Sequence, residues 1–247
     1  MAGLCFHHQH RNVNYFKLFT LINRLINFVS EMEKEKTDKK DHILDVAEKV
    51  FSESGYDGAS TRLISGEANV NMAMLNYYFG SKEGLFVAVF ERKINAFKEL
   101  LQNISEDESL NSWGKLELCI DKYLDRVFEN SCFHKLVNRE ISLSNHPEIN
   151  TKISNILMVN IREFKKVMQE GMDNGSFYKD ADIDFCIITI FGTKNYIINT
   201  PNVASQMLGN DVREANFMQT ALKPRMKIYI KRLLKSYLVI ENDKTNA

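Results

Sequence analysis

Apolar side chains recur along most of this chain at the spacing of α-helices. Ile43, Ala47, Val50 and Phe51 are separated by four, three and one positions, which places them on one face of a helix that begins near Thr37. The chain has only 3 Pro and 11 Gly in 247 residues, so the turns that a sheet of hairpins requires are scarce. The pattern therefore predicts an all-α fold.

A turn, a short helix and a second turn are expected next. Gly55 follows the first helix at the position where a helix end often adopts the left-handed backbone conformation, which glycine favours. Ser60 is suited to cap a short helix that runs through Ala68. Residues 69–71 make a three-residue turn in which Asn69 can adopt a positive φ.

A second short helix, Met72–Phe79, precedes a long one. Leu75 and Phe79 lie four positions apart and form the buried face of the short helix. Ser81 is the expected N-cap of the long helix. The inward stripe of that helix comprises Leu85, Phe86, Val89, Phe90, Ile94, Phe97 and Leu101.

The chain up to residue 240 continues as amphipathic helices. Ile183–Ile198 is apolar nearly all round, so we expect it to be buried on several sides. The fold class is thus all-α, a three-helix head followed by a C-terminal bundle of about six helices. The other expected helices are Trp113–Glu129, Phe133–Ser144, one that starts at Pro147 and ends near Gly171–Gly175, and 216–238 with Leu222, Met226, Ile230, Leu233 and Tyr237 on one stripe.

The short helices joined by a three-residue turn predict a helix-turn-helix unit. Packing of the first across the second leaves the opposite face of Met72–Tyr78 free to enter a DNA major groove. An ordinary fragment of a helical bundle has the same spacing, so spacing alone does not decide between the two. The small core expected here comprises Leu63, Ile64, Ala68, Val70, Leu75 and Phe79.

The residues themselves favour the DNA-binding interpretation. The strings Gly-Tyr-Asp-Gly-Ala-Ser-Thr-Arg-Leu-Ile-Ser (55–65), Ala-Asn-Val-Asn (68–71) and Leu-Asn-Tyr-Tyr-Phe-Gly-Ser-Lys-Glu-Gly-Leu (75–85) closely resemble the N-terminal domain of TetR/AcrR repressors. The resemblance is strong over residues 40–90. Asn69 stands where that family usually has Gly, and Asn76 where many members have Tyr. The difference at Asn76 concerns which DNA bases the protein prefers, not whether it binds DNA.

The resemblance and the helix geometry together suggest residues that contact DNA. Helix N-termini and hydroxyl groups hold phosphate, and Asn pairs bidentately with adenine. Lys82 matches the lysine with which the family contacts phosphate. Each of these residues could instead be a solvated surface side chain. The candidates are Ser60, Thr61, Arg62, Asn71, Met72, Ala73, Asn76, Tyr77, Tyr78 and Lys82.

The family resemblance also implies a homodimer and a ligand pocket. The dimer is expected through 183–198 and 216–238, although two apolar helices could equally be core. An internal ion pair between Arg139 and Glu140 is an alternative to a ligand site there. The candidate ligand-binding residues, polar or aromatic groups in apolar stretches, are Trp113, His134, Asn138, Arg139, Glu140, Asn195 and Tyr196.

Domain limits follow from these assignments. We expect a DNA-binding domain over 32–84, a ligand-sensing and dimerisation domain over 85–240 and a frayed tail over 241–247. Residues 1–31 look unlike the rest and are expected to be a dispensable extension from an upstream start codon. Their apolar run is too short and too interrupted to span a membrane. Their cluster of His7, His8 and His10 could bind metal, but we expect it to be a tail without function.

Composition adds little to this picture. Net charge is zero, and residues 32–98 hold 10 Lys and Arg against 11 Asp and Glu, so bulk charge does not favour DNA binding. The cysteines, Cys5, Cys119, Cys132 and Cys186, show no metal-ligand spacing, and buried thiols in a cytoplasmic protein are expected rather than a redox sensor.

The functional prediction is a one-component repressor that leaves its DNA operator when a small-molecule effector binds. No phosphate loop, metalloprotease motif or nucleophile elbow is present, so we predict neither an enzyme nor a cofactor. A regulator of the same fold controlled by a protein partner is the main alternative. An enclosed cavity would favour the ligand, and a solid core with an exposed apolar patch would favour the protein partner.

Overall fold

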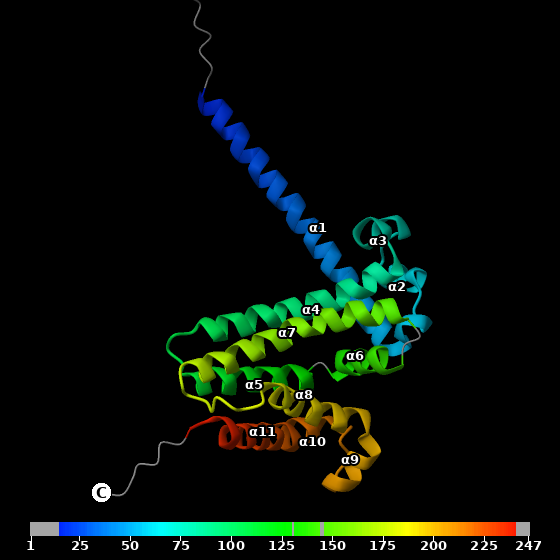
Figure 1. Cartoon of the computed structure of the whole chain (residues 1–247). Coiled ribbons are helices and arrows are strands. Elements are labelled where there is room, and N and C mark those ends of the chain that lie inside the picture. The colour runs from blue at the N-terminus through cyan, green and yellow to red at the C-terminus, as the bar shows by residue number, and fades with distance from the viewer. Residues whose placement is uncertain (1–14, 130, 144–145, 241–247) are drawn as a thin grey trace, which may run out of the picture. The chain divides into compact units, whose positions relative to one another are not determined.

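The computed structural model describes residues 15–129, 131–143 and 146–240. Within these ranges the regular structure is helical, apart from one isolated antiparallel bridge between Phe177 and Val239 (Figure 1). The prediction of an all-α fold is confirmed. The chain divides into two compact units, Met1–Ile43 and Leu44–Ala247, and the functional features below belong to the second.

Helix α1, Tyr15–Gly58, begins well before the expected start near Thr37. No Gly or Pro interrupts the sequence between Tyr15 and Ser54, so nothing in it ends a helix there. Lys39 pairs with Glu35 one turn earlier, at 2.7 Å. The expected boundary between residues 31 and 32 falls inside this helix. The expected dispensable extension stays a prediction, and its histidine cluster lies outside the described residues.

Two short helices complete the head. Helix α2 spans Thr61–Glu67, and helix α3 spans Met72–Phe79. Gly55 interrupts the helical geometry of α1 with φ 75°, and Asn69 is the one described non-glycine residue with a positive φ, 52°. Both predicted left-handed positions are therefore confirmed.

The core of the head differs from the expected set in one respect. Ile64, Ala68 and Leu75 are buried, but the Leu63 side chain is 44% exposed. The inward face of α2 consists of positions 64, 65 and 68, and Leu63 lies about 100° around the helix from Ile64. The expectation that Leu63 faces inward was wrong. Val70 and Phe79 are half-buried.

The bundle begins with helices α4 (Lys82–Glu106), α5 (Ser112–Glu129), α6 (Ser131–Leu143) and α7 (Pro147–Asp173). Helices α4 and α7 lie side by side and run in the same direction (Figure 1). Glu83 pairs with Lys152 near their first turns, and Gln102 donates to Glu163 at 3.0 Å further along.

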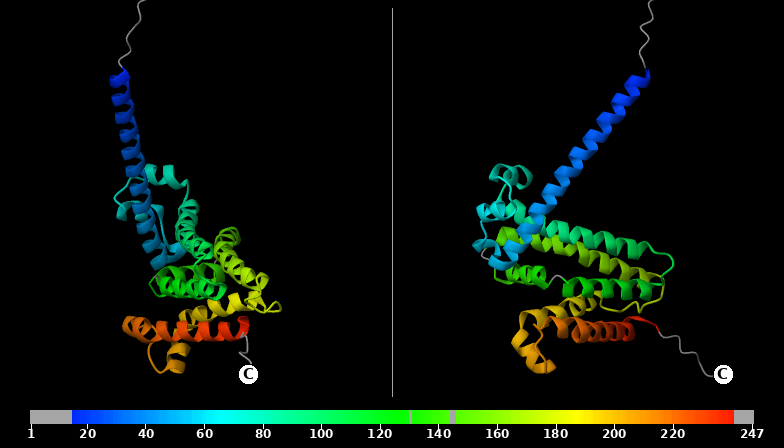
Figure 2. Two further views of the ribbon diagram at one scale, coloured as in Figure 1. Left: turned by 90° about the vertical axis from the view of Figure 1, so that its left-hand side faces the viewer. Right: turned by 180° about the vertical axis from the view of Figure 1, so that it is seen from behind.

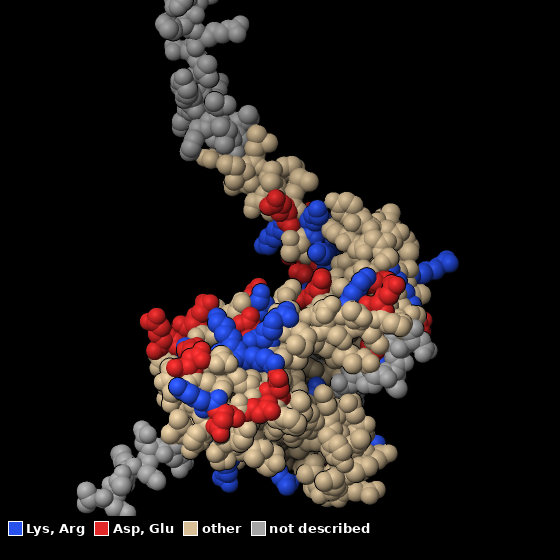
Figure 3. Space-filling model, in the orientation of Figure 1, with Lys and Arg blue, Asp and Glu red and all other residues tan. Residues whose placement is uncertain are grey.

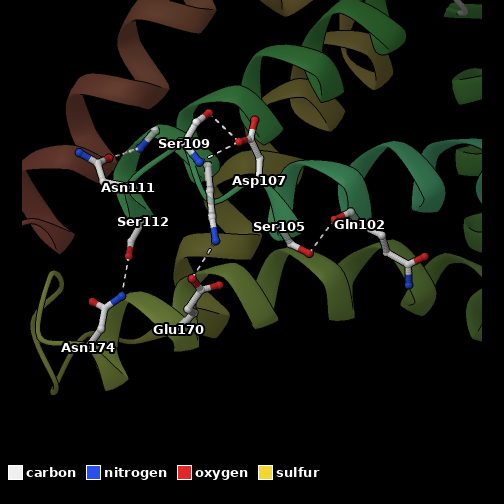
Figure 4. A network of polar contacts seen from close by, with 10 residues as sticks. Gln102, Ser105, Asp107, Ser109, Asn111, Ser112, Glu170 and Asn174 are labelled. Atoms are coloured by element: carbon white, nitrogen blue, oxygen red, sulfur yellow. Dashed lines mark hydrogen bonds and ion pairs between the residues drawn. The ribbon is translucent and has the colours of Figure 1, made fainter.

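A polar network joins the end of α7 to the start of α5 (Figure 4). Asn111 caps α5 by accepting from the amide of Gly114 at 2.8 Å. Lys115 pairs with Glu170 at 2.8 Å, and Asn174 donates to Ser112 at 2.9 Å. These contacts fix α5 antiparallel to α7.

Helices α8 (Ile183–Asn199), α9 (Pro201–Leu208) and α11 (Lys223–Leu238) form the layer on the other side of α5 and α6 from α4 and α7 (Figures 1 and 2). A short helix α10, Ala215–Phe217, and a π-helix over Met218–Leu222 lead into α11. Helix α11 packs antiparallel to α5 along a ladder of ion pairs. Its pairs are Lys223–Asp125, Lys227–Asp125, Lys231–Asp121 and Lys231–Glu117, at 2.8 to 3.4 Å.

Helix α8 is not buried on several sides, as its sequence had suggested. Cys186, Ile187 and Ile190 are buried, whereas Phe185 and Tyr196 on the other face are exposed. The last helix is divided in the same way: Leu222, Met226, Ile230, Leu234 and Leu238 are buried, and Tyr229, Leu233 and Tyr237 are exposed. Apolar residues on both faces are what a helix needs if its second face packs on another chain.

The described cysteines are buried thiols. Burial raises the pKa of Cys119 to about 12 and that of Cys186 to about 11, so both thiols stay protonated at neutral pH. A search of the described helices finds none with the length and apolar character that crossing a membrane requires.

Candidate DNA-binding face and effector cavity

Side-chain caps position the two helices of the DNA-binding face. The Ser60 hydroxyl accepts from the amide of Leu63 at 3.1 Å, and the Asn71 side chain accepts from the amide of Met74 at 2.7 Å. Each cap satisfies one of the free amides at a helix start and fixes the direction in which that helix leaves its turn.

The outer face of α3 is exposed and uncharged. Ala73, Asn76 and Tyr77 are exposed, Tyr78 is half-buried, and Leu75 on the opposite face is fully buried. The sequence of α3 contains no charged residue, and the surface over α3 in Figure 3 shows correspondingly few charged side chains. This face can meet base edges, but it offers little charge to phosphate.

The first turns of α2 and α4 supply the charge and hydroxyl groups. Arg62 is exposed, and Thr61 is half-buried beside the Ser60 cap. The ammonium of Lys82 lies 4.5 Å from the centre of the Tyr56 ring and 3.5 Å from the carbonyl oxygen of Asp57. Lys82 is therefore held at the end of α1 rather than extended freely into solvent.

Arg139 and Glu140 lie where the head meets the bundle, not in a ligand cavity. Arg139 donates to the carbonyl oxygen of Phe51 at 2.9 Å, and Glu140 accepts from the amide of Tyr56 at 3.2 Å. The expected ion pair is present at 3.5 Å. The structure thus places two candidate ligand residues at the junction with the head.

Helices α4 to α8 enclose a cavity of about 350 Å³. Its apolar wall includes Phe97 of α4, Val137 of α6, Leu157 and Ile161 of α7, and Phe191 of α8. The lining side chains that are exposed are Ile141 of α6 and Ile188 of α8, so the cavity reaches the protomer surface between these helices. The volume lies within the range of about 300–1,000 Å³ that is usual for small-molecule sites.

Polar atoms without partners line this cavity. Within the described part of the chain, Tyr123 Oη, His134 Nε2, Asn160 Oδ1 and Asn195 Oδ1 are buried and make no hydrogen bond. Burial, and then the nearby charges of Lys194 and Arg126, lower the pKa of His134 well below its usual value, so the ring is neutral. Buried polar atoms are normally bonded, so these atoms are suited to a ligand.

Lys194 is one of the polar cavity residues that were not predicted from the sequence, together with Tyr123, Arg126 and Asn160. Its surface is only 4% exposed, and burial lowers its pKa from 10.5 to about 8. A signal was available, because Lys194 is the single lysine or arginine in the apolar segment Ile183–Asn199. Its neighbours Asn195 and Tyr196 were predicted as ligand residues instead.

The structure brings together only part of the predicted ligand set. His134 and Asn195 lie on the cavity wall. Trp113 packs elsewhere, with Lys235 over its ring, and Tyr196 lies in a groove beside α9 and α11. The side chain of Asn138 lies outside the described part.

Comparison with known families places these features in context. Residues 43–89 match the family described as "Bacterial regulatory proteins, tetR family", and residues 90–209 match "YsiA-like protein, C-terminal region". A helix-turn-helix head joined to an α-helical bundle with a cavity is the architecture of a one-component transcriptional regulator. The chain belongs to the TetR family, and the predicted class, a DNA-binding transcriptional regulator, is confirmed.

Relatives agree in class and fold. The chain is 27% identical over 169 residues to the fatty acid metabolism regulator protein of Bacillus subtilis, which covers 68% of this chain and 85% of that protein. The structure of the regulator FadR from Bacillus subtilis with stearoyl-CoA has a TM-score of 0.61 at 21% identity and covers 78% of this chain and 96% of that one. FadR from Bacillus halodurans gives 0.62 at 22% identity, over 77% of this chain and 97% of that one. These descriptions name regulators, not enzymes.

Proposed function

We propose that this protein is a homodimeric repressor that binds a pseudo-palindromic operator and releases it when a fatty-acyl compound enters the cavity between α4 and α8. The observation that carries the proposal is the cavity itself, in which apolar walls surround unpartnered polar atoms. The relatives named for fatty acid metabolism, and the stearoyl-CoA complex of one of them, support the acyl class.

Recognition of DNA is assigned to α3 and to the helix starts around it. Asn76 and Tyr77 are exposed on the face opposite Leu75, so they are suited to read base edges, with Met72 and Ala73 against thymine methyl groups. The further contacts proposed, mainly to phosphate, come from Ser60, Thr61, Arg62, Asn71, Tyr78 and Lys82. Such a regulator would act in the cytoplasm, where its operator lies.

The dimer is assigned to the exposed faces of α8 and α11. Phe185, Tyr196, Tyr229 and Tyr237 are large apolar or aromatic side chains that are about half exposed or more, and they lie outside the buried faces of these helices. Large exposed apolar side chains gathered on two neighbouring helices favour an interface. If this surface forms the dimer, no separate protein partner is needed to explain its exposure.

Coupling between cavity and head is assigned to α6. His134 and Val137 line the cavity, and Arg139 and Glu140 on the same helix hold the end of α1. An effector that moves this helix therefore moves the groups that position the DNA-binding head.

The test is a mobility-shift titration of the full chain with DNA from around its own gene. Saturated fatty acids and their CoA thioesters are then added to the complex. Release of the DNA by either class supports the proposal, with an unrelated duplex as the control for non-specific binding. If the protein stays on the operator in the presence of every acyl compound, the proposed effector class is wrong. If it binds no duplex specifically, the assignment of the DNA-binding face is wrong.

A further inference from the structure

The buried lysine of α8 is not explained by an apolar ligand alone. Lys194 has no ion-pair partner among the described residues, although it is almost fully buried. It lies on the wall of the effector cavity and also of an adjoining smaller cavity of about 130 Å³. Burial of an unpaired charge is strongly unfavourable, and an anionic ligand would remove that penalty.

The cavity wall as a whole is positively charged. Its lining includes Arg126 and Lys194 and contains no Asp or Glu. Tyr123 Oη and His134 Nε2 on the same wall have no hydrogen-bond partner in the described structure. Ammonium, phenol hydroxyl and imidazole N–H groups are all hydrogen-bond donors, as a carboxylate requires.

The position of Lys194 along α8 determines the orientation of the ligand. Ile188 lies exposed at the mouth of the cavity, whereas Lys194, six residues or about 9 Å further along the axis of the same helix, is almost fully buried. An acyl-CoA with its nucleotide outside the mouth would place its alkyl end against the buried ammonium. The 130 Å³ space beyond Lys194 is well below the roughly 300 Å³ at which small-molecule pockets begin, so it does not hold a nucleotide either.

We propose that the effector is a free carboxylic acid with a single long alkyl chain, which binds with its carboxylate paired to Lys194 and its chain along the apolar wall formed by Phe97, Leu157, Ile161 and Phe191. This inference rests on the proposed function, which assigns the cavity to the effector. It differs from that proposal in the head group, since it selects the free acid over the CoA thioester.

The experiment compares head groups at constant chain length. Calorimetric titration of the full chain uses saturated acids from octanoate to palmitate, below their micelle concentrations, with the methyl ester and the CoA thioester of each. The wild-type protein should bind the acid at least about tenfold more tightly than the ester, as expected for a hydrogen bond to a charged group. Lys194→Met should lose about that factor for the acid and none for the ester.

Lys122→Met is the matched control, because Lys122 is an exposed lysine of α5 and lies outside the cavity. It should keep the preference for the acid. The thermal midpoint of Lys194→Met should rise, because the variant removes an unpaired buried charge, and a rise also shows that the variant folds. If the variant does not fold, the relative affinities of the wild-type protein for the acid, the ester and the thioester still test the carboxylate assignment.

The outcomes separate this inference from the proposed function. Equal or tighter binding of the ester or thioester by the wild-type protein, or an acid preference that survives in Lys194→Met, overturns the carboxylate assignment. Operator release by the thioester alone leaves the proposed function intact and overturns this inference. Absence of binding by every acyl compound overturns both.

Discussion

The guanidinium group of Arg139 lies against the backbone at Gly55. Its Nη2 donates to the carbonyl oxygen of Phe51 at 2.9 Å, and a Cβ built on Gly55 would lie 2.6 Å from the same nitrogen. Gly55 also has a φ of 75°, where a residue with a side chain is strained. The backbone conformation therefore requires glycine where the head meets α6, and a Cβ there would also displace the end of the Arg139 side chain.

Substitution of this glycine should destabilise the protein. Gly55→Ala combines backbone strain with a clash against Arg139, so we expect the free energy of unfolding to fall by about 1–3 kcal/mol. Gly66→Ala is the control, because a Cβ there meets no atom within 4 Å and α2 should gain about 0.5–1 kcal/mol. Urea denaturation of both variants measures the difference, and equal effects of the two would contradict the assigned role of Gly55.

Loss of the Arg139 contact should weaken the coupling between effector binding and operator release more than it weakens effector binding itself. Arg139→Met removes the bond to Phe51 and leaves the cavity wall unchanged, so effector affinity should stay the same. The ratio of operator affinities without and with saturating effector should fall, within the roughly 5- to 150-fold range that such coupling usually spans. Arg162→Met, at an exposed position of α7, is the control. An unchanged ratio would show that the head is coupled by other contacts.

The turns of the head could be predicted from sequence because their determinants are local. Ser60 and Asn71 each cap the amide three residues later, and Asn69 adopts its positive φ within a three-residue turn. Such contacts depend on the residue type and on a few neighbours. The periodicity of the apolar residues predicted the helices of the bundle for the same reason.

The cavity and the junction could not be predicted in this way because they depend on long-range packing. Arg139 meets Phe51 across 88 positions of sequence, and periodicity does not reveal that contact. Arg139 and His134 looked alike as polar residues in an apolar stretch, yet one faces the head and the other the cavity. The exposed Leu63 was missed because a helix of seven residues gives too short a pattern to define its inward face.

Substitution of a base-reading residue and substitution of a phosphate-contacting residue should affect DNA binding differently. Asn76 is exposed on the uncharged face of α3, so Asn76→Ala should cost about 1–3 kcal/mol on the operator and much less on a scrambled duplex. Lys82→Ala should weaken binding to both duplexes and lower the dependence of affinity on salt. Titration of each variant against both duplexes distinguishes these effects.

Leu75→Ala is the control for folding in that series. Leu75 is fully buried, so its truncation should lower stability by about 2–4 kcal/mol and reduce DNA binding only as the fold is lost. Equal weakening of both duplexes by Asn76→Ala, with an unchanged thermal midpoint, would show that α3 is not the reading helix.

A charged substitution on the exposed face of α11 should make the dimer dissociate into monomers. We expect the wild-type protein to be a dimer at micromolar concentration, with its recognition helices about 34–38 Å apart, one turn of DNA or slightly more. Tyr229→Asp places an unpaired charge in the assigned interface and should shift light scattering toward the monomer. Tyr178→Asp, at an exposed tyrosine outside these helices, should not. A wild-type monomer would refute the assigned dimer.

The buried state of Lys194 should appear in the dependence of stability on pH. Its pKa is lowered by burial from 10.5 to about 8 in the folded protein, so between these values the unfolded chain binds the proton and the folded chain does not. The free energy of unfolding therefore rises with pH in this window, and below pH 8 the penalty for burying the charge is fully present.

The measured quantity is the difference in unfolding free energy between wild type and Lys194→Met, because contributions that the two proteins share cancel in it. That difference should increase in favour of wild type from about pH 8 to 10.5. A saturating carboxylic acid should remove most of the increase, because its charge stabilises the ammonium and raises the pKa of Lys194 toward its ordinary value. Chemical denaturation at several pH values, with and without the acid, measures both effects. A difference that stays constant across this range would show that Lys194 is solvated in the folded protein, and the buried ammonium could then not be the group that selects the effector.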